Sequence, residues 1–430
     1  MANLTIHLKN GNKLFYNNTL STLIWEDGQP VVQGQVQEEG IWKNYHWEAS
    51  KTGNVKKLKI QLGLSCNYSC EYCNQRFVPH SPETNKFDIQ PFLEKLPTWF
   101  KPEGEVNIQF WGGEPLVYWK TLQPLAEALA QMYPQSRFSI ITNGSLLDSV
   151  KNEWLDRMGF DVAVSHDGPG QAVRGPEPDW EGIIDLYKRL HPQSRFTLNA
   201  MLNRQNTSRA AIEDYFAKQL GTREFVVGEG GMIDPYDQGG ASMSLQGEAE
   251  AVAFRKRALD EIKVGRGRKV AVIEQKIMDF IYALQTGRPA SVLGQKCGMD
   301  KPDNLAVDLR GNVLTCQNTS AVTNHKIGHV EALDQVNLSA TSRHWSTRKD
   351  CSSCPVIQLC GGGCMFLEGD LWDKGCDNAF SDNIVFFAAA IEMLTGSVPV
   401  RIEGSSRPDR EYLFEVRTPT KTIIPIKEVK

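Results

Sequence analysis

The chain has 430 residues, 41% hydrophobic and 23% charged, a composition that favours two or three globular domains and disfavours disorder. Its net charge of −4 gives no global field for nucleic acid or for an anionic membrane surface. The longest apolar run, 384–394, is too short for a membrane span, and residues 1–13 lack the apolar core of a secretory signal. We therefore expect a cytoplasmic protein without nucleic-acid or membrane partners.

The first two regions of the chain differ in their periodicity. Residues 1–52 predict short strands separated by Asn-Gly and Asp-Gly turns. Between 53 and 240, short apolar strands alternate with helical segments, which predicts a parallel sheet, open or curved into a partial barrel, with helices outside. The expected strands of this sheet lie at 58–64, 106–112, 138–142, 161–165, 196–202 and 225–230.

The remainder of the chain is expected to form three further parts. Two linking helices, at 246–264 and 270–286, occupy the region 241–290, and a cysteine-rich domain covers 291–381. The region 382–430 begins with an apolar helix near 382–395 and continues through a polar linker into a strand-like tail. We expect this tail to pair with the N-terminal strands. Such terminal strands offer edges that a leader peptide could extend.

The distribution of the ten cysteines is the strongest chemical signal. Cys66, Cys70 and Cys73 form a CxxxCxxC motif directly after the first expected parallel strand. Three thiolates on one loop can hold three irons of a cubane iron–sulfur cluster and leave the fourth iron open to a ligand from outside the protein. A tetrahedral zinc site is the alternative, and it needs a fourth ligand for which His80 is the local candidate.

This motif, together with later segments, resembles the radical S-adenosylmethionine (SAM) family over residues 58–231. The resemblance implies a partial (β/α)6 barrel related to the TIM barrel. Tyr72 matches the aromatic position that packs against adenine, and Ser165 and Asp167 match a segment that contacts the ribose and shapes the substrate cavity. Asn199 is a further candidate contact with SAM. The GGEP segment, which in isolation could be a simple turn, implies that the methionyl amino group of SAM is held by Gly112, Gly113 and Glu114.

The later cysteines resemble the SPASM extension of radical SAM enzymes, which binds two auxiliary iron–sulfur clusters. By this resemblance the first auxiliary cluster is ligated by Cys297, Cys316 and Cys364. The second is ligated by Cys351, Cys354, Cys360 and Cys376. The CSSC segment alone would also suit a zinc knuckle or a redox dithiol. With all seven cysteines in order, we expect SAM and three [4Fe–4S] clusters as cofactors.

Counting ligands leaves one auxiliary iron without a thiolate. Three clusters, one of them open for SAM, would use about eleven thiolates, whereas the chain has ten cysteines. The gap falls in the first auxiliary cluster. Asp300, Asp303 or Asp308, water, or a substrate thiolate could complete it.

The resemblance implies a radical SAM oxidoreductase that uses a 5′-deoxyadenosyl radical to abstract hydrogen from an unreactive C–H bond. Our leading hypothesis is maturation of a ribosomally made precursor peptide by a C–C or thioether cross-link, with flavodoxin or ferredoxin as electron donor. Oxidation of Cys or Ser to formylglycine, as in sulfatase maturation, is the runner-up. Those relatives carry an acidic residue after the cysteine that matches Cys316, where this chain has Gln317. A non-enzymatic electron-transfer or binding protein is the third possibility.

Overall fold

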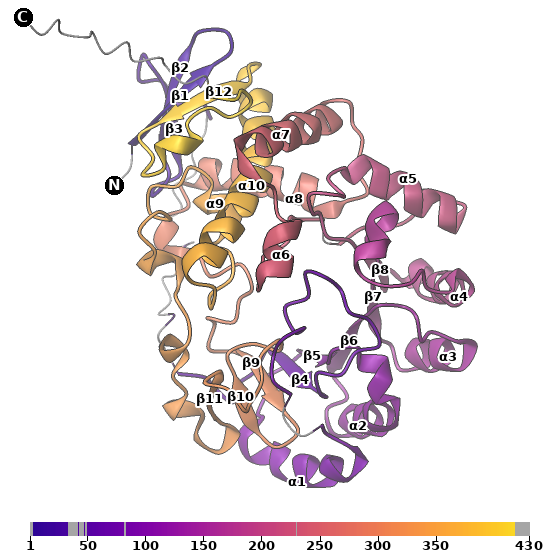
Figure 1. Ribbon diagram of the computed structural model, residues 1–430. Helices are drawn as coiled ribbons and strands as arrows, with labels where there is room; N and C mark the ends of the chain where they lie inside the picture. Colours follow the sequence, from indigo (N-terminus) through magenta and orange to yellow (C-terminus); the bar gives the residue numbers. More distant parts are fainter. Residues whose placement is uncertain are drawn as a thin grey trace, which may run out of the picture.

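The computed structural model describes residues 3–32, 42, 47, 50–80, 83–228 and 230–417. It contains one sheet of eight strands, in the order β11-β10-β9-β4-β5-β6-β7-β8, and one of four strands, in the order β12-β1-β2-β3 (Figure 1). No helix in the described ranges is long and apolar enough to cross a membrane.

The larger sheet is built on parallel strands, as the alternating sequence pattern predicts. β4 pairs in parallel with β5 on one side and with β9 on the other, and the parallel order continues through β6 and β7 to β8. These strands are β4 (Lys57–Gln61), β5 (Val106–Trp111), β6 (Ser136–Thr142), β7 (Asp161–Ser165), β8 (Phe196–Asn199) and β9 (Asn304–Asp308). Two short antiparallel strands, β10 (Asn312–Leu314) and β11 (Lys326–His329), complete one edge.

Five helices lie along the outside of β4 to β8 (Figure 1). They are α1 (Ile89–Trp99), α2 (Trp119–Met132), α3 (Ser149–Arg157), α4 (Trp180–Leu190) and α5 (Arg209–Leu220). Asp148, Asp179 and Ser208 cap the last three of these helices through side-chain bonds to backbone amides of the first turn. The α/β fold class predicted from the sequence is therefore confirmed.

The side chains of β4 alternate between an apolar face of the sheet, packed in the core, and a polar face that lines a cavity. Leu58 and Ile60 are fully buried in the hydrophobic core on the helix side. Lys57 and Lys59 alternate with them and line a cavity on the opposite face. The interior of the curved sheet therefore holds polar groups instead of apolar packing, which positions it to bind ligands.

The expected sixth strand at 225–230 is reduced to isolated bridges. Val227 bridges to Leu198 of β8 and to Val270, without a continuous ladder. Gly228 passes so close to β8 that a Cβ there would lie 2.7 Å from the Asn199 Oδ1 atom. This close approach favours glycine, and glycine weakens strand pairing. At the other edge of the barrel, β9 extends the sheet instead.

The linking helices occur where they were predicted, at α7 (Gly247–Lys263) and α8 (Ala271–Thr286), with the short α6 (Gln238–Met243) before them. The C-terminal helix α10 (Gly369–Thr395) begins well before the expected start near residue 382. Its apolar segment 384–391 is buried, and Figure 1 shows α10 beside α7 and α8. The helix thus joins the cysteine-rich region to the hydrophobic core. The short α9 (Ile357–Cys360) lies within that region.

The four-stranded sheet unites the two ends of the described chain. Strands β1 (Asn3–Leu8), β2 (Lys13–Asn17) and β3 (Thr22–Trp25) form a meander, and β12 (Pro399–Glu403) pairs antiparallel with β1. This strand precedes the polar linker, whereas the strand expected to pair here was the tail after it. Both outer strands have further backbone partners: the Ile402 amide donates to the Glu411 carbonyl, and the Val31 amide donates to the Leu23 carbonyl. The edges suggested for a leader peptide are thus at least partly occupied. The predicted tail beyond residue 417 lies outside the described residues.

Candidate functional site

A cavity of ≈ 560 Å³ opens inside the curved sheet. Of the sequence-predicted SAM contacts, its walls contain every one except Asp167, namely Tyr72, Gly112, Gly113, Glu114, Ser165 and Asn199. They also contain two groups of cysteines, namely Cys66, Cys70 and Cys73 at one place and Cys297, Cys316 and Cys364 at another. The structure therefore brings the CxxxCxxC loop and three later cysteines, more than 220 residues away in sequence, to one shared cavity.

The GGEP turn after β5 is packed directly against the loop that leads to Cys66. A Cβ atom on Gly113 would lie 2.4 Å from the carbonyl oxygens of both Leu64 and Ser65, so only glycine fits there without a backbone shift. The Glu114 amide donates to the Ser65 carbonyl at 3.1 Å. This contact fixes the cysteine loop relative to the SAM side of the cavity.

The Glu114 carboxylate is buried and held by three donors. Its oxygens accept bonds from the Thr142 hydroxyl (2.7 Å), the Asn143 amide (2.7 Å) and the Leu116 amide (3.0 Å). Burial raises the pKa of Glu114, while these hydrogen bonds lower it. Since the donors come from the ends of β5 and β6, Glu114 joins two strand ends at the rim of the cavity. Its contact with the SAM amino group stays a prediction.

Tyr72 is fixed by a buried pair of charges. Its hydroxyl donates to Asp167 Oδ2 at 2.5 Å and accepts from Arg174 Nη1 at 3.0 Å. Asp167 also accepts from the Met201 amide at 3.0 Å and lies behind the cavity wall, whereas Arg174 lies in that wall. Asp167 therefore orients Tyr72 and does not face the cavity as expected. Nothing in the sequence pattern singled out Arg174, a cation well placed for a carboxylate.

The three groups of thiols expected from the sequence occur as three groups in space. Burial raises the pKa of each thiol in the CxxxCxxC loop, to about 11 for Cys70, and neighbouring thiols of the same loop raise it further. Burial likewise raises the pKa of Cys316 to about 12, with Cys297 adding to the effect, and Cys316 in turn acts on Cys364. Thiols with such high pKa values stay protonated at neutral pH. They would lose their protons when a metal binds them.

The remaining four thiols surround a separate cavity under the terminal sheet. Its walls contain Cys351, Cys354, Cys360 and Cys376. Arg410 donates to the Cys376 sulfur from two nitrogens, at 3.4 and 3.5 Å, and Arg407 also lies in the wall. Buried thiolates beside a guanidinium are a suitable donor set for an iron–sulfur cluster. Within the described ranges, no three His, Cys, Asp or Glu side chains lie close enough together to hold a single metal ion.

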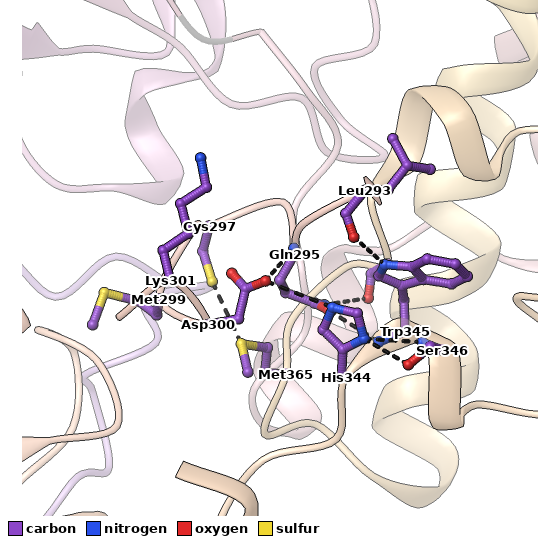
Figure 2. A network of polar contacts seen from close by, with 12 residues as sticks. Leu293, Gln295, Cys297, Met299, Asp300, Lys301, His344, Trp345, Ser346 and Met365 are labelled. Carbon is purple, nitrogen blue, oxygen red and sulfur yellow. Dashed lines mark hydrogen bonds and ion pairs between the residues drawn. The ribbon is translucent and has the colours of Figure 1, made fainter. Parts of the chain in front are cut away.

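The three aspartates considered as ligands for the first auxiliary cluster are engaged elsewhere. Asp300 accepts from the Gln295 amide at 2.8 Å and faces His344 at 3.6 Å (Figure 2). Asp303 pairs with Lys56, and Asp308 accepts from the amides of the β9–β10 turn. None of the three lies in the wall of the shared cavity. The network in Figure 2 instead supports the backbone around Cys297, because Gln295 also donates to the carbonyls of Gly362 and Gly363.

Comparisons with known proteins agree with this architecture. Residues 60–208 match the family model of the Radical SAM superfamily. The chain is 25% identical over 197 residues to the radical SAM cyclopropyl synthase TigE of Paramaledivibacter caminithermalis, a match that covers 40% of each chain. It is 23% identical over 341 residues to the serine-type anaerobic sulfatase-maturating enzyme of Klebsiella pneumoniae, covering 71% of this chain and 80% of that enzyme.

The fold is shared with a solved structure, that of hexahistidine-tagged anSMEcpe with bound AdoMet. The two superpose with a TM-score of 0.55 at 16% identity, over 80% of this chain and 99% of the other. The match shows a radical SAM domain at residues 60–208, where the sequence resemblance predicted one. The likeness to the solved structure shows a shared fold over most of both chains.

Proposed function

We propose that this protein is a radical SAM enzyme that matures a peptide or protein by a two-electron oxidation. The observation that supports this most directly is the shared cavity, which places the CxxxCxxC thiols and a second set of three thiols around one space of ≈ 560 Å³. A substrate in that space would touch both sets. When bound, the [4Fe–4S] cluster and SAM supply one-electron cleavage of SAM and a 5′-deoxyadenosyl radical.

In this proposal the residues of the chain bind and orient SAM. Cys66, Cys70 and Cys73 hold three irons of the SAM cluster, and the fourth iron is left for SAM. Tyr72 packs against adenine, held in place by Asp167 and Arg174. Gly112, Gly113 and Glu114 receive the methionyl amino group, and Arg174 is positioned for its carboxylate. Ser165 and Asn199 extend from neighbouring strand ends toward the ribose.

The two other thiol groups are proposed to hold auxiliary [4Fe–4S] clusters. Cys297, Cys316 and Cys364 hold the one that faces the substrate, and Cys351, Cys354, Cys360 and Cys376 hold the one under the terminal sheet. When bound, such clusters would give an electron from the oxidised substrate a path out of the cavity. Flavodoxin or ferredoxin is proposed as the electron donor. Asp300, Asp303 and Asp308 are not proposed as the fourth ligand of the first cluster, because each makes another contact and none lies in the cavity wall.

The substrate proposed is a ribosomally made precursor peptide that receives a C–C or thioether cross-link. The structure of anSMEcpe, a protein of similar fold, has been solved with the bound peptide Kp18Cys. This supports the proposal of a peptide substrate for the present protein. Formylglycine formation is the second candidate, favoured by the match over 71% of this chain to a sulfatase-maturating enzyme. Gln317 in place of an acidic residue argues against it.

Two measurements test the proposal. Replacing Cys66, Cys70 and Cys73 by Ala should remove about four irons and abolish reductive formation of 5′-deoxyadenosine. Retention of SAM cleavage in that variant would contradict the cluster assignment. Mass spectrometry of a co-expressed candidate precursor should then show a loss of about 2 Da, the mass of two hydrogens, as expected for oxidative cross-linking. Oxidation of a folded protein with every candidate peptide unchanged would favour the second candidate.

A further inference from the structure

Two buried lysines in this protein have very different surroundings. Lys51 and Lys59 are each 5% exposed. The Lys51 ammonium donates to three backbone carbonyls, those of Met299 (2.6 Å), Lys301 (2.8 Å) and Asn304 (2.9 Å). Since an ammonium has three N–H donors, Lys51 is fully satisfied and serves to hold the loop after Cys297.

Lys59 has a single acceptor among the described residues. Its Nζ atom donates to Gln317 Oε1 at 3.0 Å, and its side chain lies in the wall of the shared cavity. Two of its three donors are therefore left for something within that cavity. A buried ammonium with too few hydrogen-bond acceptors lowers the stability of the fold. We therefore expect a bound ligand to supply the missing acceptors of Lys59.

The charges around Lys59 indicate whether a ligand bound there would be an anion or a cation. Lys57, Lys59 and Lys296 all line the cavity, and the nearby thiols of Cys297 and Cys316 act on Lys59 through charge without a hydrogen bond to it. Of the two acidic side chains in the wall, Glu114 already accepts three hydrogen bonds and Asp234 is also engaged. The region around Lys59 therefore favours an anion that can accept two hydrogen bonds.

We propose that Lys59 and Gln317 form a subsite that binds a carboxylate of the substrate. A carboxylate offers two acceptor oxygens and neutralises the buried ammonium by a charge-assisted hydrogen bond. It would come from an Asp or Glu side chain of the peptide or from its C-terminal carboxylate. This inference rests on the proposed function, since it assumes that the substrate enters the shared cavity, and it narrows the substrate class to acidic segments.

Gln317 sets the charge of the subsite. Its backbone carbonyl accepts from the Gln61 side chain at 2.7 Å, which fixes the residue, while its neutral amide oxygen occupies one donor of Lys59. A Gln317→Glu substitution would place a carboxylate of the protein on Lys59 with little change in volume. That substitution should satisfy Lys59 internally and exclude the carboxylate of the substrate.

Stability measurements distinguish this role from a structural one. In the reconstituted enzyme without substrate, Lys59→Met and Gln317→Glu should each raise the melting temperature, because each relieves an incompletely paired buried charge. Lys51→Met should lower it, because three carbonyls then lose their donor. A fall in melting temperature for Lys59→Met as large as that for Lys51→Met would show that Lys59 is structural, and would overturn the proposal.

Binding of small probes tests the carboxylate directly. Calorimetric titration of the SAM-bound full chain should show about tenfold tighter binding of N-acetylglutamate N-methylamide than of the matching glutamine amide. The preference should disappear in Lys59→Met and Gln317→Glu and survive in part in Lys59→Arg. Lys56→Met, which removes a surface lysine from the same segment, should keep it. N-acetylalanine, whose only carboxylate is terminal, reports whether the C-terminus is the source.

Equal binding of the acidic and amide probes, or a preference that persists without Lys59, would overturn the subsite. So would a Lys59→Met variant that changes the electron paramagnetic resonance spectrum of an auxiliary cluster while leaving the preference intact, since Lys59 would then serve the cluster. Reductive cleavage of SAM needs no substrate carboxylate. Loss of probe preference with intact SAM cleavage therefore contradicts the subsite alone, whereas loss of SAM cleavage in the unmodified enzyme contradicts the proposed function.

Discussion

The two auxiliary cysteine groups differ in what surrounds them. Cys297, Cys316 and Cys364 line a large cavity that they share with the SAM side. The four-thiol group of Cys351 to Cys376 lines its own, much smaller cavity of ≈ 30 Å³, whose wall includes Arg407 and Arg410. The three-thiol group thus adjoins the space proposed for the substrate, whereas the four-thiol group does not. Under the proposed function, this difference would assign chemistry to the first group and structural and electron-transfer roles to the second.

The largest expected effect is on folding, which should depend on the four-thiol group and not on the three-thiol group. Replacing Cys351, Cys354, Cys360 and Cys376 by Ala should remove about four irons and unfold the C-terminal half, because a structural metal site contributes on the order of 10 kcal/mol to folding. Replacing Cys297, Cys316 and Cys364 should remove as many irons, leave the protein folded, and abolish product while 5′-deoxyadenosine still forms. Iron analysis, circular dichroism and chromatography measure the three outcomes. Equal loss of structure in both variants would remove the distinction.

A smaller effect on the free energy of unfolding is expected from Arg410, whose guanidinium lies in the wall of the four-thiol cavity. Arg410→Gln removes the bonds to the Cys376 sulfur and the ion pair with Asp377, and should reduce the free energy of unfolding by about 2 kcal/mol. Arg407→Gln is the matched control, because Arg407 also pairs with Asp377 but is more exposed, and should cost less than about 1 kcal/mol. Urea unfolding measures both. An Arg407 variant as unstable as the Arg410 variant would show that the thiol contact adds nothing.

Thr142→Val tests whether the SAM end of the shared cavity is independent of its auxiliary end. The change removes the hydroxyl that donates to Glu114 and should cost about 1 kcal/mol and weaken SAM binding severalfold. The spectra of the auxiliary clusters should not change. Ser139→Ala, on the same strand but bonded to Asn107, should leave SAM binding unchanged. Altered auxiliary spectra in the Thr142 variant would show that the two ends are coupled.

The last prediction is a pH dependence of stability at His166, which precedes Asp167 in the chain. Burial lowers the pKa of His166 from 6.5 to about 4, although Glu177 opposes the shift. A depressed histidine pKa means that the unfolded chain binds a proton before the folded one does. The stability due to neutral His166 is therefore present above pH 6.5 and is lost as the pH falls toward 4. Thermal melts of the wild type and of His166→Gln between these pH values should converge on acidification. Parallel curves would contradict the shift.

Much of the fold was predictable because its signals are local. Five of the six expected parallel strands and the two linking helices follow from periodicity and turn residues. The reduction of the sixth strand was not predictable in this way, because Gly228 approaches Thr197 and Asn199 of β8, a contact that only the folded chain contains. The same holds for β9, which pairs with β4 although β4 ends at residue 61 and β9 begins at residue 304.

The residues of the candidate site were likewise predictable only in part. Cysteine spacing and the GGEP segment identified residues that the structure places around one cavity. Asp167 was assigned to the cavity by its resemblance to a ribose-contacting segment, but its side chain turns back toward Tyr72. Arg174 and Lys59 were missed. For Lys59 a signal was present, since lysine at alternate positions of a buried parallel strand is unusual and indicates a polar interior.

The pairing of β1 with β12 also determines when this enzyme can be completed during synthesis. Thr5 lies opposite Glu403, and the wall of the four-thiol cavity includes Ser405, Arg407 and Arg410, directly after β12. Asn18 of the N-terminal meander binds the carbonyls of Ser352 and Cys354 from the other side. The first strands made by the ribosome must therefore wait for nearly the whole chain. Completion of the wall around these four thiols is therefore a late event, and a chain that stops before β12 would lack Ser405, Arg407 and Arg410 in that wall.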